Sequence, residues 1–237
     1  MNEAGRNPTV DLTFPHRWQA EILPARPLIL PGRHFVYPAQ AEEVERGALE
    51  VLIRPASSGQ PARQVDVLKG HDFSRADIAP KSERALAPEG SLAAHTAERS
   101  PTPEFLATCA LGFRDPAVPT GIWSCPNPDE ICAVSGGYAY VIDATDPSRF
   151  TMVPYRPVLQ ALSVPAEALL LFVSHHAILA WGVGGKEWQS EKLSDEGVSI
   201  TSIENGQLHG QGWSMLTDKE TPFSLELSTG LKVNPRG

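Results

Sequence analysis

The amino-acid sequence predicts an all-β protein built from antiparallel sheets, and three observations support this. Short runs of β-branched, aromatic and aliphatic residues recur from about residue 130 to residue 233, separated by Gly, Asn and Ser turns. One Asn-Gly dipeptide and two Gly-Gly pairs stand between such runs, as hairpin turns do. Prolines recur between residues 14 and 38, which excludes a long helix there.

The clearest predicted hairpin turns at Asn205-Gly206, between strands at 198–204 and 207–213. A type I′ turn needs positive φ at both central residues, and Asn and Gly tolerate that conformation best. The first strand alternates apolar and polar residues, which is typical of a sheet with one buried face.

Three further hairpins are expected, around Gly136-Gly137, Gly184-Gly185 and Ser228-Thr229-Gly230. In the second of these, Trp188 is expected to point inward. The apolar run at 168–173 is interpreted as a buried strand, because its neighbours in the sequence are strand-like.

The chain divides into four stretches. Residues 1–13 lack a pattern and are expected to form a loose tail. Residues 14–55 form an N-terminal β segment and residues 104–237 a β-rich main domain, and we expect these two to fold as one unit. Residues 56–103 are rich in Ser, Ala, Pro, Arg and Glu, with Phe73 as the one aromatic residue. Such low hydrophobicity cannot offset the entropy of ordering, so a long flexible, disordered insertion is predicted.

Two predicted strands flank this insertion. Residues 48–54 alternate well enough to form a strand, and residues 104–113 form an apolar stretch that reads as another. A long surface insertion adds little to the free energy of closing a loop. We therefore expect the two strands to pair antiparallel, as a hairpin whose tip is the insertion.

Three segments of the second half are similar to one another. Each places an apolar pair before a polar or glycine turn; they are 140–146, 179–185 and 224–230. Asp143 and Trp181 lie 38 residues apart, and Trp181 and Leu227 lie 46 apart. These spacings are close to the ~40–45 residues of a four-stranded propeller blade.

The pattern resembles the quinoprotein-type (PQQ-like) β-propeller repeat, in which a short strand ends at an aspartate or Thr-Gly turn and a tryptophan follows. The resemblance covers about residues 130–233, with the aspartate present as Asp143 and the tryptophan as Trp188. It implies a structural blade and does not imply a bound quinone.

Three architectures remain open, because two or three blades cannot close a ring that needs roughly four to eight. The first is a small β-sandwich or open barrel. The second is a partial propeller, completed by the first half of the chain or by another subunit. In the third, the spacing is a chance feature of a strand-rich chain.

Composition narrows the classes of function. With 41% hydrophobic and 20% charged residues the chain is globular, and no apolar stretch approaches the ~20 residues of a membrane span. No apolar segment follows Met1, so we expect a cytoplasmic protein without a membrane partner. The net charge is −8 and there is no basic stripe, which argues against nucleic-acid binding. Three sparse cysteines, Cys109, Cys125 and Cys132, are expected to be reduced thiols.

No catalytic motif is present. The sequence has no Gly-x-Ser-x-Gly elbow, and the glycines at 182–185 lack the spacing of a phosphate-binding loop. His175 and His176 are adjacent, so on a strand they would point to opposite faces and could not easily share a metal. We therefore expect no metal and no cofactor.

Five residues are candidates for a ligand or partner surface. Trp123 and Asn127 belong to the proline-rich segment 116–128, which could present a rigid recognition loop, although Trp123 could instead cap the core. Asp143, His175 and His176 complete the set. The leading hypothesis is a non-catalytic binding protein for a protein or small ligand.

Two alternatives stay open. One is a hydrolase-like enzyme whose site is built from His and Asp on several loops. Its mark would be a concave pocket with convergent polar groups and perturbed pKa values. The other is a subunit that completes a propeller with a partner.

Overall fold

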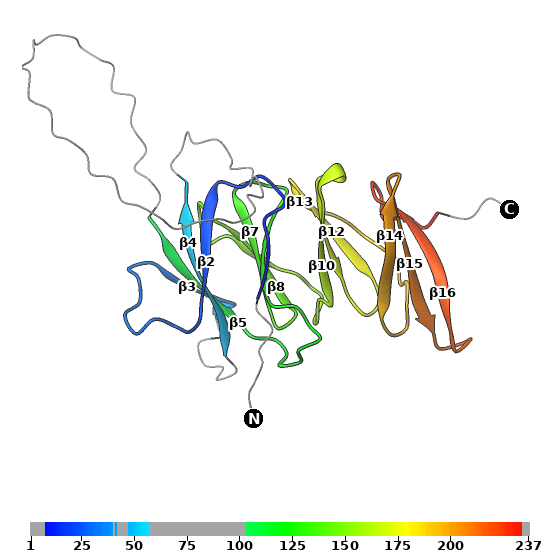
Figure 1. Cartoon of the computed structure of the whole chain (residues 1–237), viewed down its shortest axis with the longest axis horizontal. Coiled ribbons are helices and arrows are strands. Elements are labelled where there is room, and N and C mark those ends of the chain that lie inside the picture. Colours follow the sequence, from blue (N-terminus) through cyan, green and yellow to red (C-terminus); the bar gives the residue numbers. More distant parts are fainter. Residues whose placement is uncertain (1–7, 40, 42–46, 57–102, 234–237) are drawn as a thin grey trace, which may run out of the picture. The chain divides into compact units, whose positions relative to one another are not determined.

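A computed structural model describes residues 8–39, 41, 47–56 and 103–233. These residues form an all-β fold of four mostly antiparallel sheets, none of which closes into a barrel (Figure 1), so the predicted fold class is confirmed. Within the described ranges the one helical element among the named elements is a 3-10 turn at Pro165–Glu167. We call the sheets I to IV in chain order.

Sheets I and II contain the first nine strands. Sheet I has the order β2-β4-β5-β3, with β2 at Trp18–Leu23, β4 at Ala48–Pro55, β5 at Phe105–Ala110 and β3 at His34–Tyr37. Sheet II has the order β1-β6-β7-β8-β9, with β1 at Thr9–Asp11, β6 at Gly121–Ser124, β7 at Glu130–Ser135, β8 at Tyr138–Asp143 and β9 at Phe150–Met152. The β3–β5 and β1–β6 pairs are parallel.

Sheets III and IV are simple meanders in which sequential strands are neighbours. Sheet III contains β10 at Gln160–Val164, β11 at Leu169–Val173, β12 at Ile178–Gly182 and β13 at Gly185–Gln189. Sheet IV contains β14 at Val198–Glu204, β15 at Gln207–Ser214 and β16 at Lys219–Glu226. Every pair in these two sheets is antiparallel.

The predicted pairing across the insertion is confirmed. Strands β4 and β5 are antiparallel, with Leu49 opposite Cys109 and Ile53 opposite Phe105. Strand β5 ends at Ala110, three residues earlier than expected. The insertion itself lies outside the described residues, apart from its first and last residues.

The N-terminal tail is only partly as expected. Residues 9–11 form β1, which pairs in parallel with β6, although the sequence assigned residues 1–13 to a loose tail. A Cβ at Gly121 would collide with the Thr9 backbone, so the missing side chain lets β1 approach this closely. Residues 1–7 lie outside the described part of the chain.

Turn chemistry explains the hairpins. Asn205 and Gly206 have φ of 52° and 74°, as a type I′ turn requires, so that prediction is confirmed. The hairpin at Gly136-Gly137 is also present, between β7 and β8. The turn between β12 and β13 lies one residue earlier than expected, because Gly182 pairs with Gly185. The last predicted hairpin is reduced to one bridge, Leu225 to Lys232, since β16 pairs with β15.

Three apolar clusters hold neighbouring sheets together. Ile53 and Phe105 of sheet I pack in one cluster with Ile131 of sheet II. Side chains from sheets II and III form the second cluster, and those from sheets III and IV form the third. Sheets II and III are therefore buried on both faces.

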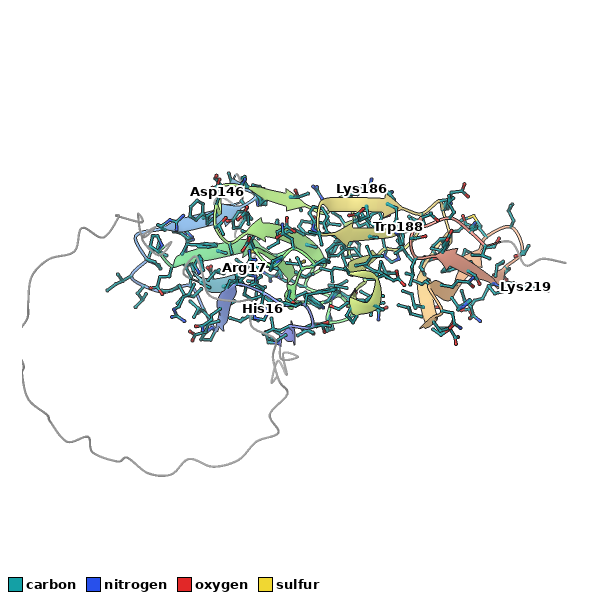
Figure 2. All side chains as sticks on the ribbon, turned by 90° about the horizontal axis from the view of Figure 1, so that it is seen from above. His16, Arg17, Asp146, Lys186, Trp188 and Lys219 are labelled. Carbon is teal, nitrogen blue, oxygen red and sulfur yellow. The ribbon has the colours of Figure 1, made fainter. Side chains whose placement is uncertain are left out.

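Tryptophan indoles connect the same sheets by hydrogen bonds. The Trp18 indole of sheet I donates to the Glu130 carbonyl of sheet II at 3.0 Å, and that of Trp181 in sheet III donates to the Glu130 carboxylate at 2.8 Å. Trp188 on β13 (Figure 2) points inward, as predicted, and donates to the Leu227 carbonyl at 2.6 Å. Each bond gives a buried indole N–H the partner it needs.

Candidate functional site: an acidic cleft at Glu130

A polar cleft lies where the start of β7 meets the end of β8 and the tryptophan of β12. Its volume is about 690 Å³, within the ~300–1,000 Å³ usual for ligand sites. The lining residues are mostly polar: Asn127, Asp129, Glu130, Val141, Asp143, Thr145, Ser148, Arg149, Phe150, Thr151 and Trp181. We call it the acidic cleft.

The turn before β7 fixes one wall. Asn127 Oδ1 accepts the Asp129 N–H at 3.2 Å, a local bond typical of an Asx turn. The Asp129 carboxylate accepts from Arg17 Nη1 at 3.1 Å. The proline-rich sequence up to residue 128 therefore ends in a rigid turn that places two polar side chains in the cleft.

The turn after β8 fixes the opposite wall. Asp143 Oδ1 accepts from the Thr145 N–H at 2.8 Å, the Thr145 hydroxyl at 2.6 Å and the Asp146 N–H at 3.0 Å. Arg149 donates to Asp143 Oδ2. This aspartate stops the strand because its side chain satisfies the first N–H groups of the turn.

Glu130 lies between the two walls. It is directly opposite Asp143 in the β7–β8 ladder, a position in which like charges are unfavourable. Burial is the main cause that raises its pKa above 4.5, and Asp143 raises it further, while hydrogen bonds from Trp181 and Asn127 lower it. Its carboxylate therefore gains protons more readily than an exposed glutamate does.

The cleft brings together two of the five candidate residues, Asn127 and Asp143. Trp123 is 3% exposed and packs in the cluster between sheets II and III, so it caps the core and offers no surface. His175 and His176 lie in the turn between β11 and β12 and do not line the cleft. The His176 Nδ1 instead lies 3.1 Å from the Ser194 carbonyl.

Sequence reasoning missed Glu130, Arg149 and Trp181. Asp129-Glu130 reads as an ordinary solvated turn, and only the register of β7 against β8 places Glu130 beside Asp143. Trp181 is more than fifty positions further along the chain and reaches Glu130 through packing of two sheets. The one local signal is Asp143 at the end of an apolar strand.

Two other kinds of functional group lie outside the cleft, metal-ligating side chains and thiols. Among the described residues no three His, Cys, Asp or Glu side chains form a group that could hold a metal ion. Cys109, Cys125 and Cys132 are buried free thiols whose pKa values are raised by burial.

Across the described ranges, no helix has the length and apolar character needed to cross a membrane. No family model, curated protein or solved structure matches this chain. Because one fold can carry many functions, the function is argued from the site.

Proposed function

We propose that this chain is a non-catalytic binding protein and that the acidic cleft receives a cationic segment of a partner protein. One observation carries the proposal: the carboxylates of Asp129, Glu130 and Asp143 converge on one cleft. Arg149 is the one cation among its lining residues. Arg17 also pairs with Asp129 from outside the lining, so three carboxylates face two guanidinium groups and the net charge at the cleft is negative.

Binding is favoured over catalysis because the polar atoms are already held. Asp143 accepts four hydrogen bonds that build its turn, and Asp129 is tied to Arg17. Glu130 accepts from the Trp181 indole at 2.8 Å. Side chains fixed in this way are preorganised, which lowers the entropy lost when a partner binds.

A cation is favoured over a neutral ligand because of the environment of Glu130. This carboxylate is partly buried, and a charge in a less polar environment attracts a partner more strongly than one in bulk water. A guanidinium or ammonium group in the cleft would also relieve the repulsion between Glu130 and Asp143.

Fluorescence anisotropy tests the proposal. A fluorescein-labelled tetrapeptide with two arginines should bind, and the same peptide with two glutamates should not. Binding should weaken as NaCl rises from about 0.05 M to about 0.5 M, because salt screens charges. The double variant Asp129→Asn, Glu130→Gln should bind the basic peptide about tenfold more weakly.

The matched control is the double variant Glu191→Gln, Glu220→Gln, which also removes two carboxylates, both exposed and outside the cleft lining. It should leave peptide binding unchanged. Equal loss in the control and the cleft variant would mean that only the overall charge matters, and the proposal would fail. Absence of binding to the wild-type protein would have the same consequence.

A second candidate, a hydrolase-like enzyme, is favoured by the raised pKa of Glu130. A carboxyl group with a raised pKa opposite an aspartate is the arrangement a general acid needs. Such an enzyme would use Glu130 and Asp143, and no histidine, since His175 and His176 lie elsewhere. Hydrolysis of chromogenic glycosides or esters that Glu130→Gln abolishes would favour this candidate over binding.

We also propose that sheets II, III and IV are propeller-like repeats of a partial propeller that a partner completes. Support comes from strands β6 to β16: within each of the three sheets, strands that are consecutive in the sequence are antiparallel neighbours. Trp188 packs on Gly230, where a Cβ would collide with its ring, and Gly230 follows Thr229 as the resemblance implies. Light scattering of the purified protein should show either a self-associated species or a complex with a partner. A monomer that binds neither a second copy nor a partner would count against this proposal.

The cytoplasmic location expected from the sequence also remains a proposal. The support for it is that the three buried cysteines are free, which suits a reducing compartment. Cell fractionation of a tagged protein would test it, and recovery in a secreted fraction would contradict it.

A further inference from the structure

A second pocket lies on sheet I, away from the acidic cleft. Its volume is about 310 Å³. Side chains alternate along β4, so Glu50 faces away from the core that contains Val51 and Leu49. The pocket is lined by Leu23, Pro24, Ala25, Arg26, Val36, Ala41, Gly47, Ala48, Glu50, Thr108 and Ala110.

Glu50 is the unusual residue of this pocket. It is 5% exposed, and its one hydrogen bond with a described residue comes from the Thr108 hydroxyl, which donates to Oε2 at 2.6 Å. No described Lys, Arg or His side chain lies within ion-pair distance of it. Burying a carboxylate without a positive partner is costly, so a cationic group entering the pocket would be strongly favoured.

The hydrogen bond from Thr108 to Glu50 determines how His34 contacts the same hydroxyl. The His34 Nε2 lies 2.8 Å from Thr108 Oγ1. Because the Thr108 proton goes to Glu50, the hydroxyl can only accept from His34, and Nε2 must carry a proton. Thr108 therefore has no further proton to offer, and no described residue donates a hydrogen bond to the second oxygen of Glu50, which can accept one from a ligand.

Arg26 supplies the opposite charge in the pocket lining. It is exposed, and it forms no ion pair with any described residue. Its Nη2 lies 3.5 Å from His34 Nε2, which is too long for a good hydrogen bond and meets a nitrogen that is already a donor. As far as the described residues are concerned, its N–H groups are therefore available to an anionic group.

The two charges are close enough for one small ligand. Contacts of 3.5, 2.8 and 2.6 Å connect Arg26 through His34 and Thr108 to Glu50. Other residues of the lining, such as Leu23, Val36 and Ala48, are aliphatic. The pocket therefore offers an acceptor for an ammonium group, a donor for a carboxylate and an apolar wall.

We propose that this pocket binds a free aliphatic α-amino acid. The ammonium group pairs with Glu50, the carboxylate pairs with Arg26, and the side chain lies against the aliphatic wall. A volume of about 310 Å³ is at the small end of ligand sites, which suits a ligand of this size. The site is separate from the acidic cleft and does not depend on what the cleft binds.

The test is a titration of the whole chain with L-leucine and two analogues that each lack one charge. Isothermal calorimetry should detect leucine binding. The amine 3-methylbutylamine lacks the carboxylate and 4-methylpentanoate lacks the ammonium group, so each should bind about ten- to a hundredfold more weakly, the loss expected for one charged hydrogen bond.

Two variants locate the site. Arg26→Gln removes an exposed cation and should fold normally, yet bind leucine about ten- to a hundredfold more weakly. Glu50→Gln should weaken binding by a similar factor, while its melting temperature stays equal to or above that of the wild-type protein, because it removes an unpaired buried charge. The matched control is Glu21→Gln, an exposed carboxylate on β2 of the same sheet, which should bind as the wild-type protein does.

Three results would overturn the proposal. The wild-type protein could give no heat with leucine at millimolar concentrations. Both single-charge analogues could bind as well as leucine, which would show that the pocket does not recognise a zwitterion. Arg26→Gln and Glu50→Gln could bind leucine as the wild-type protein does, which would place any binding elsewhere.

Discussion

Strands β6 to β9 of sheet II and the three strands of sheet IV both form antiparallel meanders, yet their patterns of apolar residues differ. In β7 of sheet II, five consecutive residues from Ile131 to Ser135 are buried, because Ile131 faces sheet I and Cys132 faces sheet III. In β15 of sheet IV, buried and partly exposed residues alternate, and Leu208 is the apolar residue that joins the cluster with sheet III.

This difference shows how position in the stack determines sequence. A sheet with neighbours on both faces needs apolar side chains on both, so its strands are continuous apolar runs. A sheet with one neighbour needs them on one face and shows the period-two alternation. Among the described residues, sheets I and IV each pack against one neighbouring sheet, whereas sheets II and III each pack against two.

The largest effect should come from shortening a side chain between two sheets. Ile131 is fully buried, so Ile131→Ala should lower the free energy of unfolding by roughly 2–5 kcal/mol. Ile200 of sheet IV is only partly buried, and Ile200→Ala should cost less than half as much. Urea titration of both variants measures the contrast, and equal losses would mean that sheet IV is packed as tightly as sheet II.

The next effect concerns the bond between sheets III and IV. Trp188→Phe keeps an aromatic ring but removes the N–H that donates to the Leu227 carbonyl at 2.6 Å. A buried acceptor without its donor should lower the free energy of unfolding by about 1–3 kcal/mol. Thermal denaturation followed by circular dichroism would show this loss. Trp213→Phe on β15 of sheet IV serves as the matched control, since its partly exposed indole donates no hydrogen bond to a described residue. A loss no larger than the control's would contradict the role assigned to the Trp188 indole.

A smaller effect should appear in the pH dependence. The pKa of Glu130 is raised in the folded protein, so its favourable contribution is fully present below the unfolded value of about 4.5 and is lost as pH rises through the folded pKa. Glu130→Gln should remove this part of the decline in stability between acidic and neutral pH. Denaturant titrations at about pH 4 and pH 7 test it, and an unchanged pH dependence in the variant would show that Glu130 does not contribute.

The smallest effect is expected on the exposed face of sheet IV. Ser199 on β14 is exposed, and Ser199→Ala should change the free energy of unfolding by roughly 0.5 kcal/mol or less. The same urea titration measures it. A loss above about 1 kcal/mol would indicate that this face is covered by another part of the molecule or by a second copy.

Local chemistry made much of the fold predictable. The turns at Asn205-Gly206 and Gly136-Gly137 follow from the conformational preferences of the turn residues themselves. The β4–β5 pair follows from two apolar runs that flank the insertion. The β1–β6 pair was not predictable, because a short polar strand has no pattern and its partner is more than a hundred residues away. The parallel pairing depends on a close approach at Gly121 that only the folded backbone reveals.

The candidate site was predictable only at its turns. Asn127 and Asp143 are turn-forming residues beside apolar strands, so sequence alone pointed to them. Their meeting with Glu130 depends on strand register, and the Trp181 contact depends on how two sheets pack. His175 and His176 were attractive as a pair of histidines, but their turn belongs to a different sheet from both walls of the cleft.

The Trp181–Glu130 hydrogen bond has an optical consequence. An indole emits at a wavelength that depends on nearby charge, and this one lies 2.8 Å from the carboxylate of the acidic cleft. A cation that enters the cleft, or a proton that binds Glu130, changes the field at that ring. The difference between the emission of the wild-type protein and that of Trp181→Phe isolates this indole and thus reads the occupancy of the cleft without any added label.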